Sequence, residues 1–167
     1  MMKHSREEKE LPKRKPRPRL DHECYVGRDI YSVTICTNGN HHAFIKPDTI
    51  SGVLYEMYEA AGHTSHSVAA YCVMPDHLHM LLIGKTSDSD VEIFVHRFKQ
   101  RTGYFYKKIT GKKLWQTSYY DHVLREEEDL TEVVNYIVSN PERSGLVKDY
   151  REYPWIGSQI CDVRALQ

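Results

Sequence analysis

Two histidines lie two residues apart in the stretch His77-Leu78-His79, within a run of apolar residues. Side chains alternate between the faces of a β-strand, so both imidazoles would project from one face while Leu78 points into the core. Imidazoles on a largely buried strand need partners, and a divalent metal ion is a common one. The spacing predicts part of a metal site, with a hydrogen-bonded pair of core histidines as the alternative.

A tyrosine and an asparagine, Tyr136 and Asn140, are four residues apart nearer the C-terminus. On a helix, such residues are neighbours one turn apart. Asn140 offers a carbonyl oxygen as a ligand, and Tyr136 offers a phenolic oxygen that could attack a phosphodiester polarised by a metal ion. The alternative is that Tyr136 packs at a helix edge and Asn140 ends the helix before Pro141.

Seven elements are predicted around these residues from apolar spacing and turn residues. Strands are expected at 29–37, 67–73, 77–83 and 118–124, and helices at 47–62, 91–109 and 130–140. The first six follow the ferredoxin-like βαββαβ order, an α+β fold with an antiparallel, RRM-like palm. The seventh, an added C-terminal helix, would bring Tyr136 and Asn140 over the free sheet face and beside the histidines.

Length and composition indicate one globular domain. The 167 residues are 28% charged and 40% hydrophobic, and the apolar runs are too short to span a bilayer. Four separated cysteines and an N-terminus without an apolar run favour a cytoplasmic protein with free thiols. We expect a basic arm at 1–22, a folded domain at 23–160 and a short tail at 161–167.

The net charge of zero hides an uneven distribution. Residues 1–20 carry eight basic and three acidic side chains, and residues 93–120 carry seven basic, eight aromatic and no acidic ones. Phosphates favour positive fields and unpaired bases stack on aromatic rings, so both segments suit a nucleic-acid partner. The alternatives are a solvated tail and an ordinary amphipathic helix.

The predicted nucleic-acid contacts come from both segments. They are Lys13, Arg14, Lys15, Arg17 and Arg19 in the arm, and Arg97, Lys99, Arg101, Tyr104, Lys108, Lys112, Lys113 and Trp115 in the second segment. The phenylalanines of the second segment, Phe94, Phe98 and Phe105, are expected to face the core.

Three stretches resemble the single-tyrosine HUH transposases, and most closely their REP-associated tyrosine transposase branch. They are VMPDHLHMLL at 73–82, YYDHVLREEEDL at 119–130 and NYIVSNPERSGLV at 135–147. The resemblance implies that His77, His79 and the polar third ligand Asn140 bind Mg²⁺ or Mn²⁺. It implies that Tyr136 is the nucleophile.

The resemblance also implies the substrate and the reaction. Single-stranded DNA would be cleaved and rejoined beside hairpins through a 5′-phosphotyrosine intermediate. The protein would act as a monomer or a homodimer, and no membrane partner is expected. Tyr119 and Tyr120 are rival nucleophiles, but they fall on an expected strand with no ligand one turn away. Two other functions stay open: a domesticated hairpin-binding protein without recombination, and a metal-dependent phosphoesterase without a covalent tyrosine.

Overall fold

The computed structural model describes residues 21–125 and 128–166. The arm residues predicted to contact DNA, which are Lys13, Arg14, Lys15, Arg17 and Arg19, lie outside this range. The helices and strands are β1 (Ile30–Cys36), α1 (Pro47–His63), β2 (His66–Met74), β3 (His77–Gly84), α2 (Val91–Thr110), β4 (Tyr120–Val123), α3 (Leu130–Val138), α4 (Asn140–Arg143) and β5 (Ile156–Gly157). Each of the seven expected elements is present, and α4 and β5 are additions.

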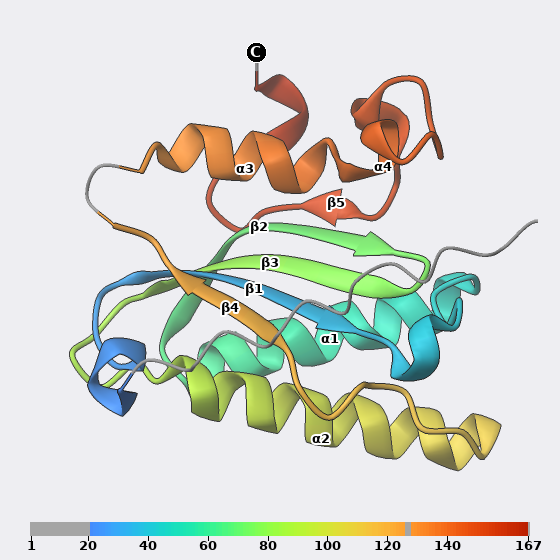
Figure 1. Ribbon diagram of the computed structural model, residues 1–167, viewed down its shortest axis with the longest axis horizontal. Helices are drawn as coiled ribbons and strands as arrows, with labels where there is room; N and C mark the ends of the chain where they lie inside the picture. The colour runs from blue at the N-terminus through green and yellow to red at the C-terminus, as the bar shows by residue number, and fades with distance from the viewer. Residues whose placement is uncertain (1–20, 126–127, 167) are drawn as a thin grey trace, which may run out of the picture.

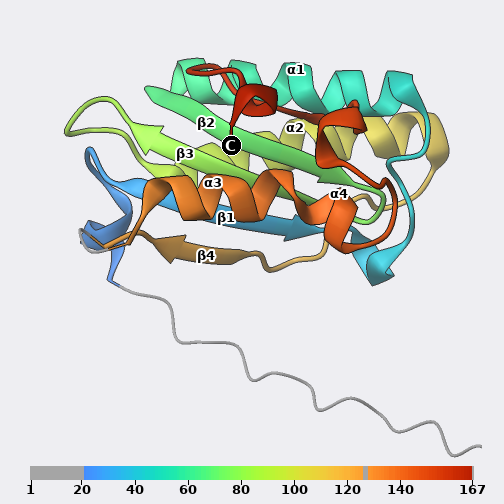
Figure 2. The same cartoon turned by 90° about the horizontal axis from the view of Figure 1, so that it is seen from above.

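The strands form one five-stranded antiparallel sheet in the order β4-β1-β3-β2-β5 (Figure 1). β3 lies in the middle, between β1 and β2, as a ferredoxin-like βαββαβ order requires. Helices α1 and α2 cover one face of the sheet, and α3 and α4 lie over the other (Figure 2). The predicted α+β fold class is therefore confirmed. No helix within the described residues is long and apolar enough to cross a membrane.

The layer between the sheet and helices α1 and α2 holds the larger core. Leu78, Met80 and Leu82 of β3 are fully buried there, which confirms the predicted alternation along this strand. Phe94 and Phe98 of α2 pack into the same layer, as expected. The prediction for Phe105 is wrong, because this ring is 46% exposed and lines a groove between α1 and α2 instead.

A second, smaller core lies between the sheet and α3. Val134 and Ile137 of α3 pack with Cys72 of β2 and Leu81 of β3. Val163 is also buried in this cluster, so the segment expected as a tail at 161–167 contributes a core residue. This packing fixes α3 across the face from which His77 and His79 project.

Helix α3 ends earlier than predicted. It stops at Val138, and Asn140 begins the short helix α4 with Pro141 in its first turn. Proline has no N–H to donate, but the first turn of a helix does not need that donor, so Pro141 starts a new turn instead of ending the helical path. Asn140 therefore still follows Tyr136 by one turn.

Candidate active site

The two histidines of β3 lie side by side on the face covered by α3. Their Nε2 atoms are 3.1 Å apart, and their rings are perpendicular. Each Nδ1 atom contacts an oxygen: that of His77 lies 2.6 Å from Asp76 Oδ1, and that of His79 lies 2.8 Å from Thr34 Oγ1. These outer contacts orient both rings with their Nε2 atoms together.

The protonation state of His79 favours ligand chemistry. Burial, followed by the nearby His77 and the positive charge of Arg143, lowers the pKa of His79 to about 4. The imidazole of His79 is therefore neutral at physiological pH. Neutral imidazole is the form that binds metal ions.

Tyr136 lies next to His79 of this pair. Its ring centroid is 6.3 Å from that of His79, and the two rings meet edge to face. The tyrosine is 52% exposed, so its side chain is open to a substrate. The structure thus brings the predicted nucleophile against the predicted metal ligands.

Asn140 is almost fully buried beneath Tyr136. Its amide Nδ2 donates a hydrogen bond of 3.1 Å to the backbone oxygen of Tyr136. This bond orients the side chain and assigns its Oδ1 atom as the group left for a ligand. Within residues 21–125 and 128–166, no cluster of three or more His, Cys, Asp or Glu side chains could hold a metal ion. The neutral oxygen of Asn140 is of another residue type, and it stays the predicted third ligand.

One residue of the site was not predicted from the sequence. The guanidinium carbon of Arg143, at the end of α4, lies 4.2 Å from the centroid of the Tyr136 ring. The signal that could have found it is a spacing of seven residues, because positions two helical turns apart lie on the same side of a helix.

The rival tyrosines lie elsewhere. Tyr120 pairs with Thr34, and Thr34 pairs with His79, so Tyr120 shares the face of His79 but stands two strands away, about 10 Å. Tyr119 lines a cleft formed with α2, and the Lys99 ammonium lies 5.6 Å from its ring centroid. Of the three tyrosines, Tyr136 is the one in ring contact with a histidine of the pair.

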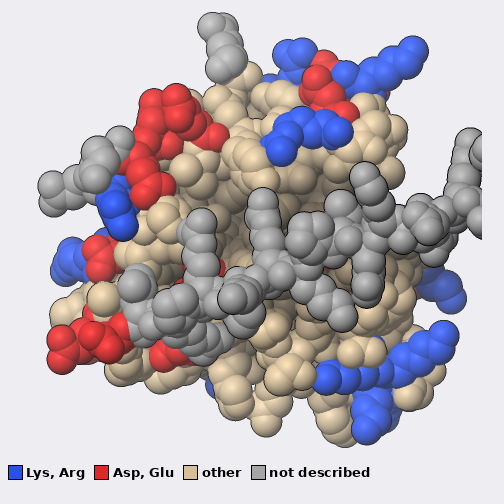
Figure 3. Space-filling view, viewed as in Figure 1, with Lys and Arg blue, Asp and Glu red and all other residues tan. Residues whose placement is uncertain are grey.

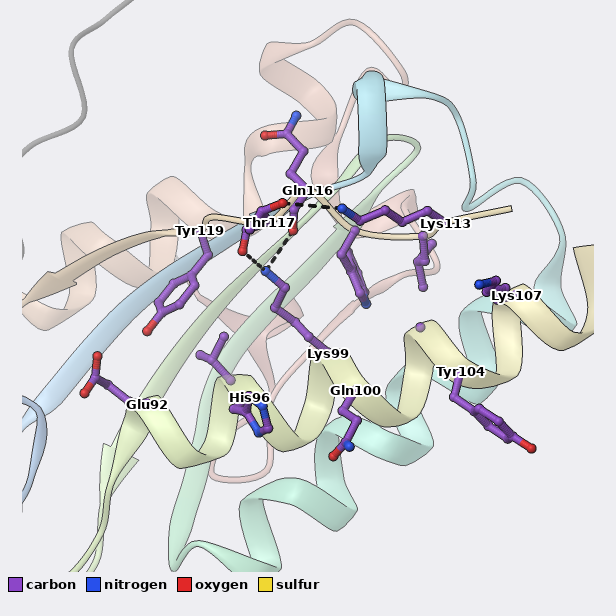
Figure 4. A pocket seen from close by; sticks show the side chains of 14 residues that line it. Glu92, His96, Lys99, Gln100, Tyr104, Lys107, Lys113, Gln116, Thr117 and Tyr119 are labelled. Carbon is purple, nitrogen blue, oxygen red and sulfur yellow. Dashed lines mark hydrogen bonds between the residues drawn. The ribbon is translucent and has the colours of Figure 1, made fainter. Parts of the chain in front are cut away.

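A cleft of about 770 Å³ lies between α2 and residues 113–119 (Figure 4). Lys107, Lys113 and the exposed Tyr104 line it, and Glu92 is the one carboxylate among its lining residues. Lys99 reaches across the cleft and donates 2.9 Å hydrogen bonds to the backbone oxygens of Gln116 and Thr117. The acid-free segment thus forms an open, mainly basic surface.

Trp115 does not fit its predicted role. It is 3% exposed, and its ring packs between Phe44 and Phe98 while its Nε1 atom donates to Thr102 Oγ1. No ring face is free to stack on a base, so the prediction that Trp115 contacts DNA is wrong. The spacing of aromatic residues did not distinguish a core tryptophan from a surface one.

The remaining predicted contacts of this segment divide into two kinds. Two guanidinium nitrogens of Arg101 donate to the two carboxylate oxygens of the buried Glu56 of α1. Arg97 is half-buried. Lys108 and Lys112 are exposed near the end of α2. The structure gathers Lys99, Tyr104 and Lys113 around the cleft but does not bring all the predicted contacts to one surface.

The fold and the histidine–tyrosine site define a class of protein. The chain belongs to the family described as Transposase IS200 like, which matches residues 27–140. The matched range includes His77, His79, Tyr136 and Asn140.

Two known proteins are similar in sequence to part of this chain. The REP-associated tyrosine transposase of Escherichia coli K12 is 28% identical over 88 residues, which cover 53% of this chain and 52% of that protein. A Haemophilus influenzae protein named for the same kind of transposase is 27% identical over 114 residues, 62% of this chain and 64% of its own length. The chain therefore spans less than two thirds of these relatives.

A solved structure shares the fold. The structure of a REP-associated tyrosine transposase bound to a REP hairpin superposes with a TM-score of 0.69 at 19% identity. The superposition covers 86% of this chain and 82% of that one.

Proposed function

We propose that this protein is a DNA transposase that cleaves and rejoins single-stranded DNA beside hairpin sequences through a covalent bond between Tyr136 and a 5′ phosphate. The observation that carries the proposal is the exposed Tyr136 ring in contact with His79, whose Nε2 atom lies 3.1 Å from that of His77. Membership of the IS200-like family and the hairpin bound by the structural neighbour support it.

A divalent cation, Mg²⁺ or Mn²⁺, fits the histidine pair. Two ligand atoms about 2.1 Å from one ion and at right angles would be about 3.0 Å apart, which is close to the 3.1 Å between the Nε2 atoms. The contacts of both Nδ1 atoms are of the kind that orients metal-bound histidines. His77, His79 and Asn140 would hold the ion, and when bound it would polarise the scissile phosphate.

The reaction then requires one bond exchange at phosphorus. The exposed Tyr136 hydroxyl gives its proton to water, and its oxygen attacks the phosphorus in line. The bond from phosphorus to the 3′ oxygen breaks, and that oxygen takes a proton from water. The 5′ end of the DNA stays on Tyr136, and a 3′ hydroxyl is released. Attack by this or another 3′ hydroxyl reverses the exchange, so no nucleotide cofactor is consumed.

The cleft beside α2 supplies contacts for the DNA outside the reacting phosphate. Lys107 and Lys113 offer charge, and the exposed Tyr104 ring offers a stacking surface. Tyr120 on β4 is 64% exposed on the face of the histidines, between this edge of the sheet and the site. Single-stranded DNA could therefore run from the cleft across β4 toward Tyr136.

A trapping experiment tests the proposal. The protein is incubated with Mg²⁺ and labelled hairpin oligonucleotides taken from palindromes that flank its gene, together with a pool of hairpins with randomised single-stranded flanks. We expect a covalent adduct on a denaturing gel with the wild type and with the control Tyr120→Phe, and none with Tyr136→Phe.

Each of the other functions gives a different result. Cleavage that survives Tyr136→Phe would replace the proposal with a metal-dependent phosphoesterase. A wild-type protein that shifts hairpin DNA on a native gel without cutting it would indicate a domesticated binding protein.

A further inference from the structure

Arg143 is held over Tyr136 by the backbone that joins α3 to α4. Its backbone N–H donates to the Ser139 oxygen at 3.0 Å, and the N–H of Ser144 donates to the Asn140 oxygen at 2.9 Å. These bonds carry the helical path past the end of α3. They place the guanidinium carbon 4.2 Å from the centre of the Tyr136 ring.

Within residues 21–125 and 128–166, no carboxylate forms an ion pair or a hydrogen bond with the guanidinium of Arg143. Arg151, which lines the same cleft, differs in this respect because it pairs with Asp149 at 2.7 Å. The cleft, of about 690 Å³, is open and runs along Tyr136. Arg143 therefore presents, next to the candidate nucleophile, a cation with no carboxylate partner in the described part of the chain.

Arg143 also lies near the histidine pair. The Tyr136 ring that its guanidinium covers is 6.3 Å from the ring of His79, centroid to centroid. Arg143 thus lies beside the space in which a phosphate would react.

A guanidinium stacked on an aromatic ring keeps its N–H groups available. A guanidinium that stacks on a ring uses its flat face, whereas its donors lie in the plane and form a fork that matches two phosphate oxygens. Attack by a phenolic oxygen increases the negative charge on the non-bridging oxygens of a phosphodiester. Donors fixed in advance around that charge are among the strongest contributions to catalysis.

We propose that Arg143 is a catalytic residue that binds the non-bridging oxygens of the scissile phosphate and keeps them beside Tyr136. After the attack, the same contact holds the phosphate of the phosphotyrosine ready for the reverse step. This role rests on the proposed function, and it assigns an anion-binding site to the cleft beside Tyr136.

The test compares Arg143→Gln with Arg143→Lys in single-turnover adduct formation. The control is Lys148→Gln, which removes an exposed cation that does not line this cleft. At saturating hairpin DNA, Arg143→Gln should lower the maximum rate about 10²- to 10³-fold. The half-saturating DNA concentration should change only a few-fold. Arg143→Lys should recover part of the rate, because an ammonium keeps the charge without the fork. Lys148→Gln should stay near the wild type.

Chemical rescue separates binding of the phosphate from support of the fold. Millimolar guanidinium ion should restore adduct formation to Arg143→Ala at least several-fold and should leave Tyr136→Phe inactive. A maximum rate unchanged in Arg143→Gln would overturn the role of Arg143. So would an Arg143→Ala protein that guanidinium does not rescue and an Arg143→Lys protein as slow as Arg143→Gln.

The two proposals fail in different ways. If the wild type forms an adduct through Tyr136 at the same rate as Arg143→Gln, only the role of Arg143 is lost. If Tyr136→Phe forms as much adduct as the wild type, the proposed function itself is lost.

Discussion

The hydroxyl of Thr34 orients one of the two histidines of the candidate metal site. It lies 2.8 Å from Nδ1 of His79, on the strand next to the histidines. Such an outer contact fixes the tautomer and the direction of the ligating nitrogen. The histidine pair alone does not determine the site, because its neighbours decide where the Nε2 atoms point.

Replacing Thr34 by valine keeps the side-chain shape and removes this contact. We expect Thr34→Val to weaken Mn²⁺ binding by about 10- to 100-fold, as measured by titration calorimetry on the folded protein. Ser32→Ala is the control, because Ser32 lies two residues earlier on the same face of β1 and pairs with Leu81. Equal Mn²⁺ affinity in Thr34→Val and the wild type would contradict the assigned contact.

The titration of His66, at the start of β2, makes the free energy of unfolding depend on pH. It is buried against the rings of Tyr31 and Phe94, and its burial lowers its pKa below 6.5. Below pH 6.5 the unfolded chain binds a proton that the folded chain resists, so the free energy of unfolding falls as the pH drops toward the lowered value. Above pH 6.5, the contribution of His66 to the free energy of unfolding is fully present.

His66→Phe keeps a ring at this position and removes its titration. Thermal unfolding followed by circular dichroism should show a weaker decrease of stability below pH 6.5 in this variant than in the wild type. Part of the decrease should remain, because the pKa of His79 is lowered as well. An identical pH dependence in the two proteins would show that His66 does not contribute.

At the scale of elements, the attachment of α3 to the sheet positions the nucleophile. Ile137 follows Tyr136 directly and is 1% exposed in the smaller core. Ile137→Ala should lower the free energy of unfolding by about 2–5 kcal/mol, measured by urea denaturation. The control Ile109→Ala alters a side chain that is 83% exposed, and it should change stability by less than about 0.5 kcal/mol. Equal stability losses would mean that Ile137 does not anchor α3.

Elements with a clear local pattern could be predicted from the sequence, and those that depend on distant partners could not. The strand of His77 and His79 and the helix of Tyr136 follow from alternation and helical spacing alone. β5 consists of two residues that become a strand only by pairing with Tyr71 and Cys72 of β2. A pattern within the segment itself could not reveal that pairing.

The dependence on partners that are distant in the sequence also explains why some residues of the site were predicted wrongly or missed. Trp115 is buried because Phe44 and Phe98, which are distant in the sequence, enclose it. Arg143 could have been found from its spacing to Tyr136, but Pro141 made the helix appear to end before it. The candidate catalytic residues could be predicted because their spacing is local, and their surroundings could not because they come from the fold.

At the scale of the whole molecule, charge is distributed unevenly over the surface. In Figure 3, most acidic side chains lie on the left, with a few Lys and Arg among them, whereas most Lys and Arg side chains lie on the right, near α4 and the C-terminal end of α2. The formal net charge of zero therefore does not describe the surface that would meet DNA.

Binding of hairpin DNA should weaken as salt is added, and the cleft beside α2 should carry part of this dependence. In fluorescence anisotropy titrations, the double variant Lys107→Gln/Lys113→Gln should bind more weakly and show a slope of log affinity against log salt reduced by about 0.7 for each lost phosphate contact. Arg28→Gln/Lys85→Gln removes the same charge from exposed positions outside the cleft. Equal slopes in the two double variants would exclude the cleft as a DNA contact.

Peptide mapping of the covalent adduct identifies the residue that attacks the DNA. The covalent adduct is digested with nuclease and trypsin, and mass spectrometry locates the remaining nucleotide. We expect the nucleotide on Tyr136, in the tryptic peptide that runs from residue 126 to Arg143. A nucleotide on the peptide from residue 114 to Arg125, which carries Tyr119 and Tyr120, would contradict it.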